Sequence, residues 1–435
     1  MTLRESARSI FDVALAAGDV RPLVSRALAG TTPPDRGRVL VVGAGKASGA
    51  MAAAVEEAWG DRITGGLVAV KDGYLAPTRR VRLVEAGHPV PDERGAQAAR
   101  EIRALVESAV GDDLVLVLVS GGGSALTPAP APPVTLADKQ AVTRLLLAAG
   151  ATINQLNAVR KHCSLLNGGQ LARAAAPARV EALLLSDVVG DPLDVIASGP
   201  TTPDVSTFAE ALDILDGLGL RKRAPRAVVE RLEQGARGEI PETPKPGDPL
   251  FARVRNTVIG NNALVVDAAA SRARGLGLAP HVLTRALEGE AREAAGRFVE
   301  LARLIQAGRG PVQAPACVIA GGETTVTVRG RGAGGRCQEF ALAAALAMEG
   351  MKDAVILAAG TDGTDGPTEA AGAVADGASA ARARARGLDP AARLADNDSN
   401  PVFDRLGDLV VTGPTNTNLL DLYVLVVGTA GAPAR

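Results

Sequence analysis

The sequence is poor in aromatic residues, lysine and cysteine. Only 2% of its 435 residues are aromatic although 47% are hydrophobic, so its core must be built from Ala, Val and Leu. That composition suits tightly packed α/β layers. The cysteines Cys163, Cys317 and Cys337 are scattered and odd in number. They exclude a disulfide framework and a zinc-finger spacing, and they fit a reducing compartment.

A strong net charge and a long apolar run are also missing. The formal net charge is −1, so no strong field would draw the chain to nucleic acid or to a membrane surface. No stretch approaches about 18 uninterrupted apolar residues, and the N-terminus carries charges throughout. We therefore expect a cytoplasmic protein without a membrane span, and its length favours two domains.

Short apolar, β-branched runs alternate with Ala-rich helical stretches in the first half of the chain. The runs lie at 38–45, 65–70, 81–87, 113–123 and 181–191, and the helical stretches lie near 47–59, 95–109, 135–149 and 165–176. The repeated order of strand, glycine loop and helix predicts an α/β fold with a doubly wound, Rossmann-like parallel sheet.

The pattern breaks near 235–250, where four prolines and few apolar residues predict a linker. Further strands are expected at 256–262, 279–284, 316–322, 324–330, 354–360 and 422–428. The run at 324–330 follows its predecessor closely, which favours antiparallel pairing and therefore a mixed sheet. The predicted domains are residues 1–240 and 250–435.

The first candidate binding loop follows the buried run LVLVLV. It reads Ser120, Gly121, Gly122, Gly123 and Ser124. Glycines at the C-terminal end of a parallel strand let the backbone approach a ligand and aim its N–H groups at an anion. These five residues are therefore candidates to bind phosphate or carboxylate. A tight turn that simply needs glycine is the alternative.

The second candidate loop, VVGAGKASG, has the spacing G-x-G-x-x-x-G, a loose relative of the dinucleotide fingerprint. Gly45 and Lys46 come just after a buried strand. The Lys46 ammonium could meet phosphate oxygens or charge that develops in a transition state. The alternative is a surface lysine at a helix start, where the helix dipole disfavours it.

Charged residues suggest further ligand contacts in the first half. Asp187 and Asp191 follow a buried strand and could bind magnesium, although a helix cap or a turn would also explain them. Arg160 and Lys161, on a basic segment of helical pattern, could pair with anions. A helix with solvated cations is the ordinary alternative.

The second half of the chain repeats this pattern of glycine loops and charged residues at strand ends. Glu323 follows two glycines at a strand end, and Arg336 stands where a glycine loop leads into a helix. An arginine there opposes the helix dipole, so an anionic ligand would explain it, while Glu339 could instead pair with it locally. Asp362 and Asp365 also follow a strand and suit a metal or a hydroxyl-rich ligand, with a pair of turns as the alternative.

Together these loops describe a site for a phosphorylated, polyhydroxylated ligand. Phosphoryl transfer relies on positioning, magnesium and cations that neutralise the moving phosphoryl group. The chain lacks the P-loop motif and the protein-kinase motifs, so a kinase here must belong to another lineage.

Six segments, in order, resemble the glycerate 2-kinase family, the glycerate kinase/TtuD group with a C-terminal MOFRL domain. They are VVGAGKA, VSGGGSAL, NAVRKHCS, LLLSDVVGDPLDVIASGPT, GGETTVTVRGRGAGGRCQEFALA and AAGTDGTDGPTEAAGA. The resemblance covers nearly the whole chain. It implies ATP- and Mg²⁺-dependent transfer of phosphate to the 2-hydroxyl of D-glycerate, giving 2-phosphoglycerate and ADP.

The resemblance also implies two α/β domains with the active site in the cleft between them. By motif, Lys46 and Arg336 resemble the family's catalytic cations, the SGGGSA loop would hold phosphate or the substrate carboxylate, and Asp187 would lie near the metal. Either domain could hold the adenine. The expected partners are D-glycerate and ATP, and a homodimer is compatible with the sequence.

Two departures from the family pattern affect charge and packing. The family usually has Asn at the position of Cys337, and usually Lys and Arg at the positions of Asn167 and Gln170. We expect altered nucleotide affinity or donor preference, with activity retained because Lys46 and Arg336 remain.

Two other functions stay open. An NAD(P)H-dependent hydroxypyruvate reductase is supported by the glycine pattern at 43–49, but Asp72 lies late for the acid that binds a ribose. A non-catalytic phosphosugar-binding module would bind a ligand without turnover, although two cationic loops in separate domains favour an enzyme.

Overall fold

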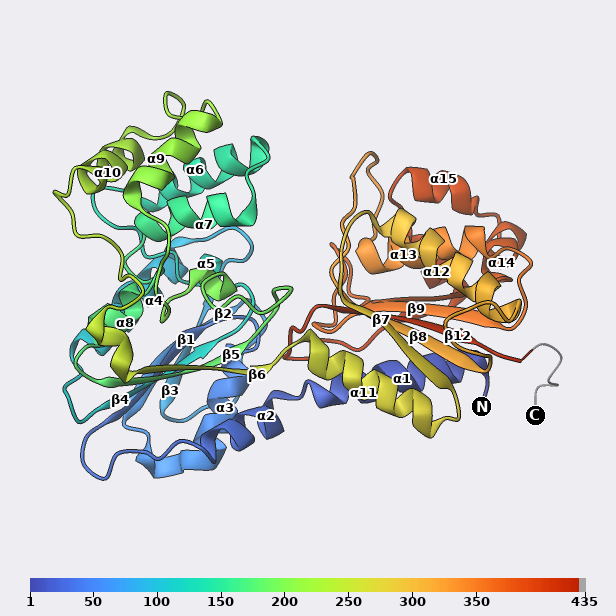
Figure 1. Ribbon diagram of the computed structural model, residues 1–435, viewed down its shortest axis with the longest axis horizontal. Helices are drawn as coiled ribbons and strands as arrows, with labels where there is room; N and C mark the ends of the chain where they lie inside the picture. The colour runs from blue at the N-terminus through green and yellow to red at the C-terminus, as the bar shows by residue number, and fades with distance from the viewer. Residues whose placement is uncertain (430–435) are drawn as a thin grey trace. The chain divides into compact units, whose positions relative to one another are not determined.

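The computed structural model describes residues 1–429, which form two compact units, each with its own sheet and helices (Figure 1). The first unit is Val20–Ile259. The second joins Met1–Asp19 to the chain from Gly260 onward. The α/β class is confirmed. No helix within residues 1–429 is long and apolar enough to cross a membrane.

The first unit contains a six-stranded sheet in the order β3-β2-β1-β4-β5-β6. Its strands are β1 (Val39–Ala44), β2 (Gly65–Lys71), β3 (Val81–Ala86), β4 (Leu114–Val119), β5 (Arg179–Leu185) and β6 (Val254–Gly260). The pairs from β3 through β5 are parallel, as predicted. Strands β1 and β4 are buried at every position, which explains their uninterrupted apolar runs.

Helices cover both faces of this sheet (Figure 1). One face carries α2 (Val20–Leu28) and α3 (Ser48–Trp59), and the other carries α4 (Glu93–Glu107), α5 (Gly123–Leu126) and α8 (Gln170–Ala175). The short turns of this unit are η1 (Gly60–Arg62), η2 (Ile196–Ser198) and η3 (Pro249–Arg253).

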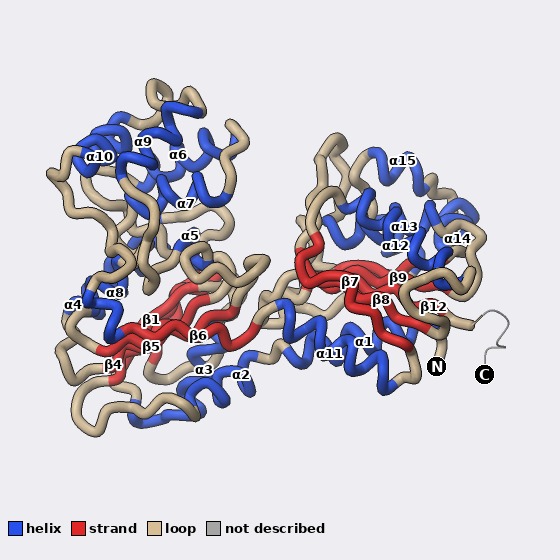
Figure 2. Tube along the Cα trace, viewed as in Figure 1, coloured by secondary structure: helices blue, strands red, loops and turns tan. Residues whose placement is uncertain are grey.

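Four further helices of this unit pack together around a separate apolar core (Figure 2). They are α6 (Leu136–Ala148), α7 (Ile153–His162), α9 (Phe208–Gly217) and α10 (Arg226–Ala236). Thr135, Thr152 and Thr207 begin three of them, each in a reciprocal capping box with an acidic or amide side chain three residues on. The sequence therefore fixes these helix starts locally.

The second unit contains a six-stranded sheet in the order β11-β10-β9-β12-β8-β7. Its strands are β7 (Ala279–Leu287), β8 (Ala316–Gly322), β9 (Ala354–Gly360), β10 (Gly372–Asp376), β11 (Leu409–Val410) and β12 (Asp421–Val427). Only β7 and β8 pair in parallel, because β12 returns antiparallel between β8 and β9. The sheet is mixed, as predicted.

Two helices lie side by side on one face of this second sheet, and others cover the opposite face (Figure 1). The pair is α1 (Leu3–Ala17) and α11 (Asn262–Gly275), and the others are α12 (Ala291–Gln306), α13 (Arg336–Ala347), α14 (Ser379–Ala385), α15 (Pro390–Ala395) and α16 (Asn400–Leu406). Strands β10 and β11 were not predicted.

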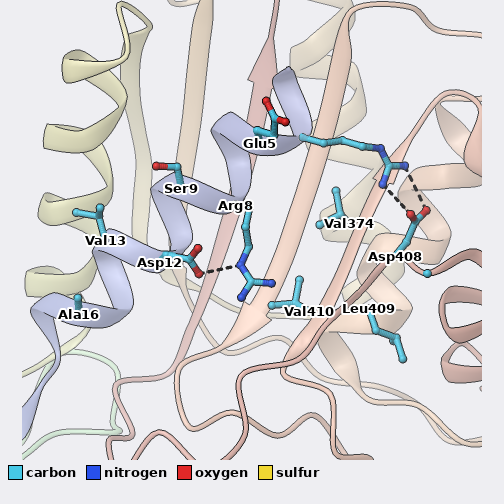
Figure 3. Close-up of a pocket in the computed structure, with 12 residues that line it drawn as sticks. Glu5, Arg8, Ser9, Asp12, Val13, Ala16, Val374, Asp408, Leu409 and Val410 are labelled. Carbon is cyan, nitrogen blue, oxygen red and sulfur yellow. Dashed lines mark hydrogen bonds and ion pairs between the residues drawn. The ribbon is translucent and has the colours of Figure 1, made fainter. Parts of the chain in front are cut away.

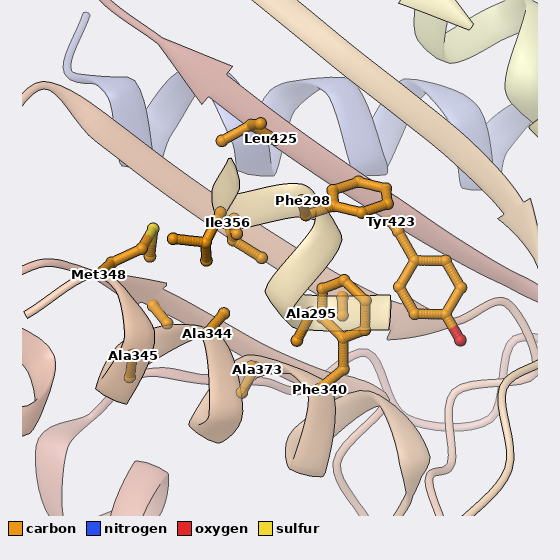
Figure 4. Packing of buried hydrophobic residues seen from close by; sticks show 14 of the residues in the cluster. Ala295, Phe298, Phe340, Ala344, Ala345, Met348, Ile356, Ala373, Tyr423 and Leu425 are labelled. Atoms are coloured by element: carbon orange, nitrogen blue, oxygen red, sulfur yellow. The ribbon is translucent and has the colours of Figure 1, made fainter. Parts of the chain in front are cut away.

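Three of the few aromatic residues meet in the core of the second unit (Figure 4). The Phe340 ring on α13 lies 5.3 Å from that of Phe298 on α12 and 4.8 Å from that of Tyr423 on β12. Ala and aliphatic side chains fill the rest of this core, as the composition predicts. This packing fixes the start of α13 beside the start of β12.

The predicted strand at 324–330 is wrong. The segment forms only an isolated parallel bridge between Thr325 and Glu290, and its backbone is otherwise irregular. The alternation of threonine and valine resembled a half-buried strand, but β12, nearly 100 residues later in the sequence, takes the place beside β8. Sequence proximity did not decide the pairing.

The predicted linker at 235–250 is also wrong, because the segment packs inside the first unit. Its Glu242 accepts from the Phe208 N–H at 2.8 Å, and its Thr243 hydroxyl donates to Asp204 at 3.0 Å. Strand β6 follows it and joins the first sheet, where Arg255 pairs with Glu181 of β5 at 2.7 Å.

The division of the chain therefore differs from the predicted boundaries of 1–240 and 250–435. The first unit runs on to Ile259, and Met1–Asp19 belongs to the second unit. Helix α1 has an apolar face, with Ile10, Phe11 and Ala14 buried, and that face packs beside α11. Amphipathic patterning predicts a helix but does not say which sheet it covers.

Candidate functional site

The strand order of the first unit reverses between β1 and β4, and the carboxyl ends of strands at such a reversal are where ligands bind in doubly wound sheets. The two predicted glycine loops follow these two strands and contact each other. The Lys46 N–H donates to the Gly121 carbonyl at 2.9 Å, and the Ala47 N–H donates to Ser120 Oγ at 2.9 Å. The fold thus brings Lys46 to the reversal point.

These loops need glycine because neighbouring atoms lie too close to leave room for a Cβ atom. Gly45 has a φ of +151°, and a Cβ there would lie 2.6 Å from the Ser120 carbonyl oxygen. Gly122 has a φ of +88°, and a Cβ there would lie 2.8 Å from the His88 ring. The glycines are therefore required by the turn geometry whatever ligand binds. Ser120 is fully buried, and its hydroxyl also bonds Ser48, so it joins the two loops.

A chain of polar side chains continues from Ser124. Its hydroxyl lies 2.8 Å from that of Ser198, which donates to Asn157 Oδ1 at 3.0 Å. Ser198 and its neighbour Ala197 have left-handed backbones, with φ of +58° and +48°. Such strain persists only where surrounding contacts hold it, and it concentrates at functional sites. The sequence prediction missed Asn157 and Ser198, although the Ser-Gly-Pro run marked this turn.

Arg160 lies one helical turn beyond Asn157 on α7 and is half-buried. It makes no hydrogen bond or ion pair with any of residues 1–429, and burial lowers the pKa of its guanidinium. A desolvated guanidinium without a counter-ion costs several kcal/mol, so an anionic ligand is the natural partner. The prediction that Arg160 binds an anion stays a prediction, and this geometry favours it.

Unlike Arg160, Lys161 has carboxylate partners within the protein. Its ammonium lies 3.2 Å from an Asp194 carboxylate oxygen and 3.3 Å from one of Asp204. Asp204 is fully buried and also accepts from Ser206 and Thr243. The protein itself supplies the anions that Lys161 was expected to meet in a ligand, so its structural role is to hold α7 against the segments that carry these two aspartates.

The two predicted metal ligands lie in the loop after β5. Asp187 and Asp191 are half-buried, and Asp191 has a left-handed backbone with a φ of +56°. Within residues 1–429 no group of three or more His, Cys, Asp or Glu side chains is arranged to hold a metal ion. Magnesium in kinases needs only one or two carboxylates besides phosphate oxygens and water, so this loop still fits it.

In the second unit Arg336 is the first residue of α13. Its Nε and Nη2 donate to the two oxygens of Asp421 at 2.6 and 2.9 Å, and its Nη1 lies 2.7 Å from Glu323. Burial lowers the pKa of Arg336, but the charge and hydrogen bonds of Asp421 outweigh it and raise that pKa. The local alternative partner, Glu339, pairs instead with Arg292 at 2.6 Å.

Asp421, the partner of the candidate residue Arg336, was not singled out from the sequence. It is the first residue of β12, pairs in register with Gly322 of β8 and Gly360 of β9, and is 1% exposed. Tyr423 donates to it at 3.0 Å. A single carboxylate between leucines gives no sequence signal, and only the pairing of β12 brings it to Arg336.

Asp365 and Asp362 have structural partners. Asp365 is buried and accepts from the N–H groups of Cys337 and Gln338 at 3.1 and 2.8 Å, so it caps α13. Burial and the nearby Asp421 raise the pKa of Asp365 to about 7. Asp362 accepts from Thr364 at 3.1 Å in a turn, as the alternative reading proposed.

A groove of about 570 Å³ in the second unit contains none of the predicted site residues (Figure 3). It runs beside α1, with Val374 and Val410 on its other side. Both of its arginines are already paired, Arg8 with Asp12 and Arg4 with Asp408. We therefore do not assign the ligand to this groove.

Comparison with known proteins places the chain. A model described as a domain of unknown function, DUF4147, matches residues 6–233, and the MOFRL family model matches residues 316–421. A protein of Thermotoga maritima named D-glycerate 2-kinase is 44% identical over 389 residues, covering 89% of this chain and 90% of that protein. The chain belongs to the glycerate 2-kinase family.

Other members of the family agree in sequence and fold. A glycerate 2-kinase of Pyrococcus horikoshii is 39% identical over 90% of this chain and 88% of that protein. The crystal structure of a Thermotoga maritima glycerate kinase has a TM-score of 0.88 at 40% identity, covering 98% of this chain and 99% of that chain. An Agrobacterium vitis protein with a provisional hydroxypyruvate reductase name is 44% identical, covering 98% of this chain and 95% of that protein.

The positions that depart from the family pattern turn inward in this chain. Asn167 donates to the Ala197 carbonyl at 2.9 Å and accepts from Ser164, so it supports the strained turn. Gln170 accepts from Arg173 at 3.1 Å. Burial, Asp421 and Asp365 raise the pKa of Cys337, which keeps it a neutral thiol.

Proposed function

We propose that this chain is a glycerate 2-kinase that transfers the γ-phosphate of ATP to the 2-hydroxyl of D-glycerate, giving 2-phosphoglycerate and ADP. One observation carries the proposal beyond family membership. The loops after β1 and β4 meet at the reversal of strand order with Lys46 on one of them. This is where a doubly wound sheet places its ligand, and phosphoryl transfer needs a fixed cation there.

The remaining roles follow from charge. The glycerate carboxylate is the proposed partner of Arg160, because that guanidinium is half-buried and has no anionic partner within residues 1–429. The loop from Gly121 to Ser124 is the proposed site for phosphate or carboxylate oxygens. Lys46 is the proposed cation that neutralises charge as the phosphoryl group moves, and Arg336 is a second candidate for that role.

Magnesium is the proposed metal, held by Asp187 with Asp191 as the second candidate. When bound with ATP it would neutralise charge on the β- and γ-phosphate oxygens. Asp187 lies two residues beyond the end of β5. Because β5 pairs in parallel with β4, the Asp187 carboxylate lies at the same edge of the sheet as the loop after β4.

A coupled assay tests the function. Purified protein, ATP, Mg²⁺ and D-glycerate should give ADP and 2-phosphoglycerate, and enzymatic analysis should find no 3-phosphoglycerate. Formation of the 3-phosphate would overturn the position of transfer. The absence of any ADP release above a D-glycerate-free control would overturn the proposal as a whole.

The hydroxypyruvate reductase alternative has the Rossmann strand order in its favour. Against it, Asp72, which follows β2 where a ribose-binding acid would be sought, is bound by both Nη atoms of Arg94 at 2.7 and 2.9 Å. Oxidation of NADH or NADPH with hydroxypyruvate, followed by absorbance, separates the two activities directly.

The cellular setting stays a proposal. The three cysteines are free thiols buried in the fold, which suits a reducing cytoplasm. A homodimer is likewise proposed only as compatible with the chain, and analytical ultracentrifugation tests it.

A further inference from the structure

The charge of Arg336 is already balanced by the protein. Two carboxylates contact this one guanidinium, Asp421 through two hydrogen bonds and Glu323 through one nitrogen. Asp365 lies close enough to both Asp421 and Arg336 that their charges shift its pKa. The start of α13 therefore carries excess negative charge, and a polyphosphate that approaches Arg336 needs further cations beside it.

Two arginines lie on the loop that leads into α13. Arg329 and Arg331 are exposed, and within residues 1–429 neither side chain makes a hydrogen bond or an ion pair. Other exposed arginines of this unit pair with a carboxylate, as Arg285 does with Asp267 and Arg384 does with Glu349. The loop thus presents two uncompensated guanidinium groups.

The backbone under these arginines is held rigidly by a three-residue segment, Asp396–Asp398, which we call the clasp. The side-chain oxygen of Asn397 accepts from the N–H groups of Arg329 and Gly330 at 2.8 and 3.0 Å. Asp396 accepts from the Arg331 N–H at 3.1 Å. The clasp therefore fixes both residues from which the guanidinium groups extend.

The clasp also connects the loop to α13, and it accepts hydrogen bonds from the backbone N–H groups of the loop. Asp398 accepts from the Ala333 N–H at 2.9 Å, and Asn397, held at a left-handed φ of +53°, donates to Glu339 of α13 at 2.8 Å. The N–H groups that a bare glycine loop would offer to an anion are thus bound by the protein from Arg329 to Arg331 and at Ala333. What this stretch offers a ligand is the two guanidinium groups.

We propose that Arg329 and Arg331 are nucleotide-binding residues that contact the polyphosphate of ATP and ADP, with the clasp as their positioning element. Guanidinium groups match phosphate oxygens in charge and in geometry. A backbone that is already ordered lowers the entropy cost of binding. The inference rests on the proposed kinase function and on Arg336 acting at the phosphates.

Steady-state kinetics with ATP and D-glycerate test the inference. Arg331→Ala and Arg329→Ala should each raise KM for ATP about tenfold, the usual size of a lost charge-assisted hydrogen bond. Inhibition by inorganic tripolyphosphate should weaken to a similar extent. At saturating ATP, kcat and KM for D-glycerate should stay within about twofold. Arg309→Ala is the matched control, because Arg309 is an exposed arginine of the same unit, and it should change none of these values.

The clasp is tested through its acceptor oxygen. Asp396→Ala should raise KM for ATP although both arginines remain, and Asp396→Asn should restore it, because an amide oxygen can still accept from the Arg331 N–H. A purely structural role would instead lower the melting temperature without this split between KM for ATP and kcat.

Two outcomes would overturn the inference while leaving the kinase function intact. One is an active wild-type enzyme whose Arg329→Ala, Arg331→Ala variant has an unchanged KM for ATP. The other is a rise confined to KM for D-glycerate, which would assign the arginines to the acceptor. An inactive wild-type enzyme would instead be a failure of the proposed function.

Discussion

At the scale of single residues, Lys46 has the clearest predicted effect. Its backbone joins the two glycine loops at the reversal of strand order, so removal of the ammonium leaves the loop contacts in place. Lys46→Ala should lower kcat by about a hundredfold or more, because one preorganised charge at a transition state has that value. Lys222→Ala, at an exposed lysine of the same unit, should leave kcat unchanged. Near-normal turnover of the first variant would remove Lys46 from the mechanism.

Asp365 should make stability depend on pH. Burial raises its folded pKa to about 7 from an ordinary value of 3.8, so the folded state keeps a proton that the unfolded state releases near pH 4. Its contribution to stability is therefore fully present below about pH 4 and is lost as the pH rises through 7. Over that interval the free energy of unfolding should fall by at most about 4 kcal/mol.

Calorimetric melting between pH 5 and 8 measures this effect. Asp365→Asn should flatten the pH dependence, whereas Asp404→Asn, at an exposed aspartate of the same unit, should keep it. Identical pH profiles for the parent and the Asp365→Asn variant would contradict the assignment.

The sequence singled out candidate residues most clearly where a glycine pattern stood next to a charged side chain. Lys46 and Gly121 were chosen through such patterns, and the fold brings their loops together. Asp421 could not be found in this way, because its role depends on β12 inserting between β8 and β9. Lys161 looked like Arg160 in sequence, and only the tertiary position of Asp204 distinguishes the two.

At the scale of elements, continuous apolar runs were reliable signals. The runs that became β1 and β4 are long and β-branched, and each ends in a glycine loop. Strand β10, which reads Gly-Ala-Val-Ala-Asp, is too short and Ala-rich to give such a signal. It becomes a strand because β9 offers it an unpaired edge.

The loop after β4 gives a test of close packing. Gly122 and Gly73 both have a left-handed backbone, with φ of +88° and +83°, but only Gly122 faces a neighbour, the His88 ring. Gly73→Ala should lower the free energy of unfolding by about 1 kcal/mol through backbone strain alone. Gly122→Ala should lower it by about 3 kcal/mol, since a clash is added.

Urea unfolding followed by fluorescence of Trp59, the one tryptophan of the chain, reports on this unit. Equal losses in the two variants would show that the His88 ring moves aside without cost. In that case the glycine at 122 would be required only for its backbone conformation.

At the scale of the whole molecule, the chain is not divided where its composition changes. Met1–Asp19 belongs to the unit that contains the C-terminal sheet, because α1 buries Ile10 and Phe11 there. Deletion of residues 1–19 should therefore destabilise the second unit selectively. Phe11→Ala should do the same more mildly, at about 3–5 kcal/mol.

Calorimetry combined with Trp59 fluorescence distinguishes the two units in this experiment. The transition reported by Trp59, which lies in the first unit, should keep its midpoint in the deletion variant, while the other transition moves to lower temperature. A fragment of residues 20–259 should likewise unfold cooperatively. A shift of the Trp59 transition equal to that of the other would contradict the division.

The sequence by itself determined the α/β class, most strands and helices, and the glycine loops with Lys46 and Arg336. These features depend on residues close together in the chain, so local patterns predict them. Only the tertiary structure decided which sheet received α1 and β6, which carboxylates neutralise Arg336, and that Arg160, unlike Lys161, has no carboxylate partner within residues 1–429. Those outcomes depend on contacts between segments far apart in the chain, such as Arg336 with Asp421, and no local pattern encodes them.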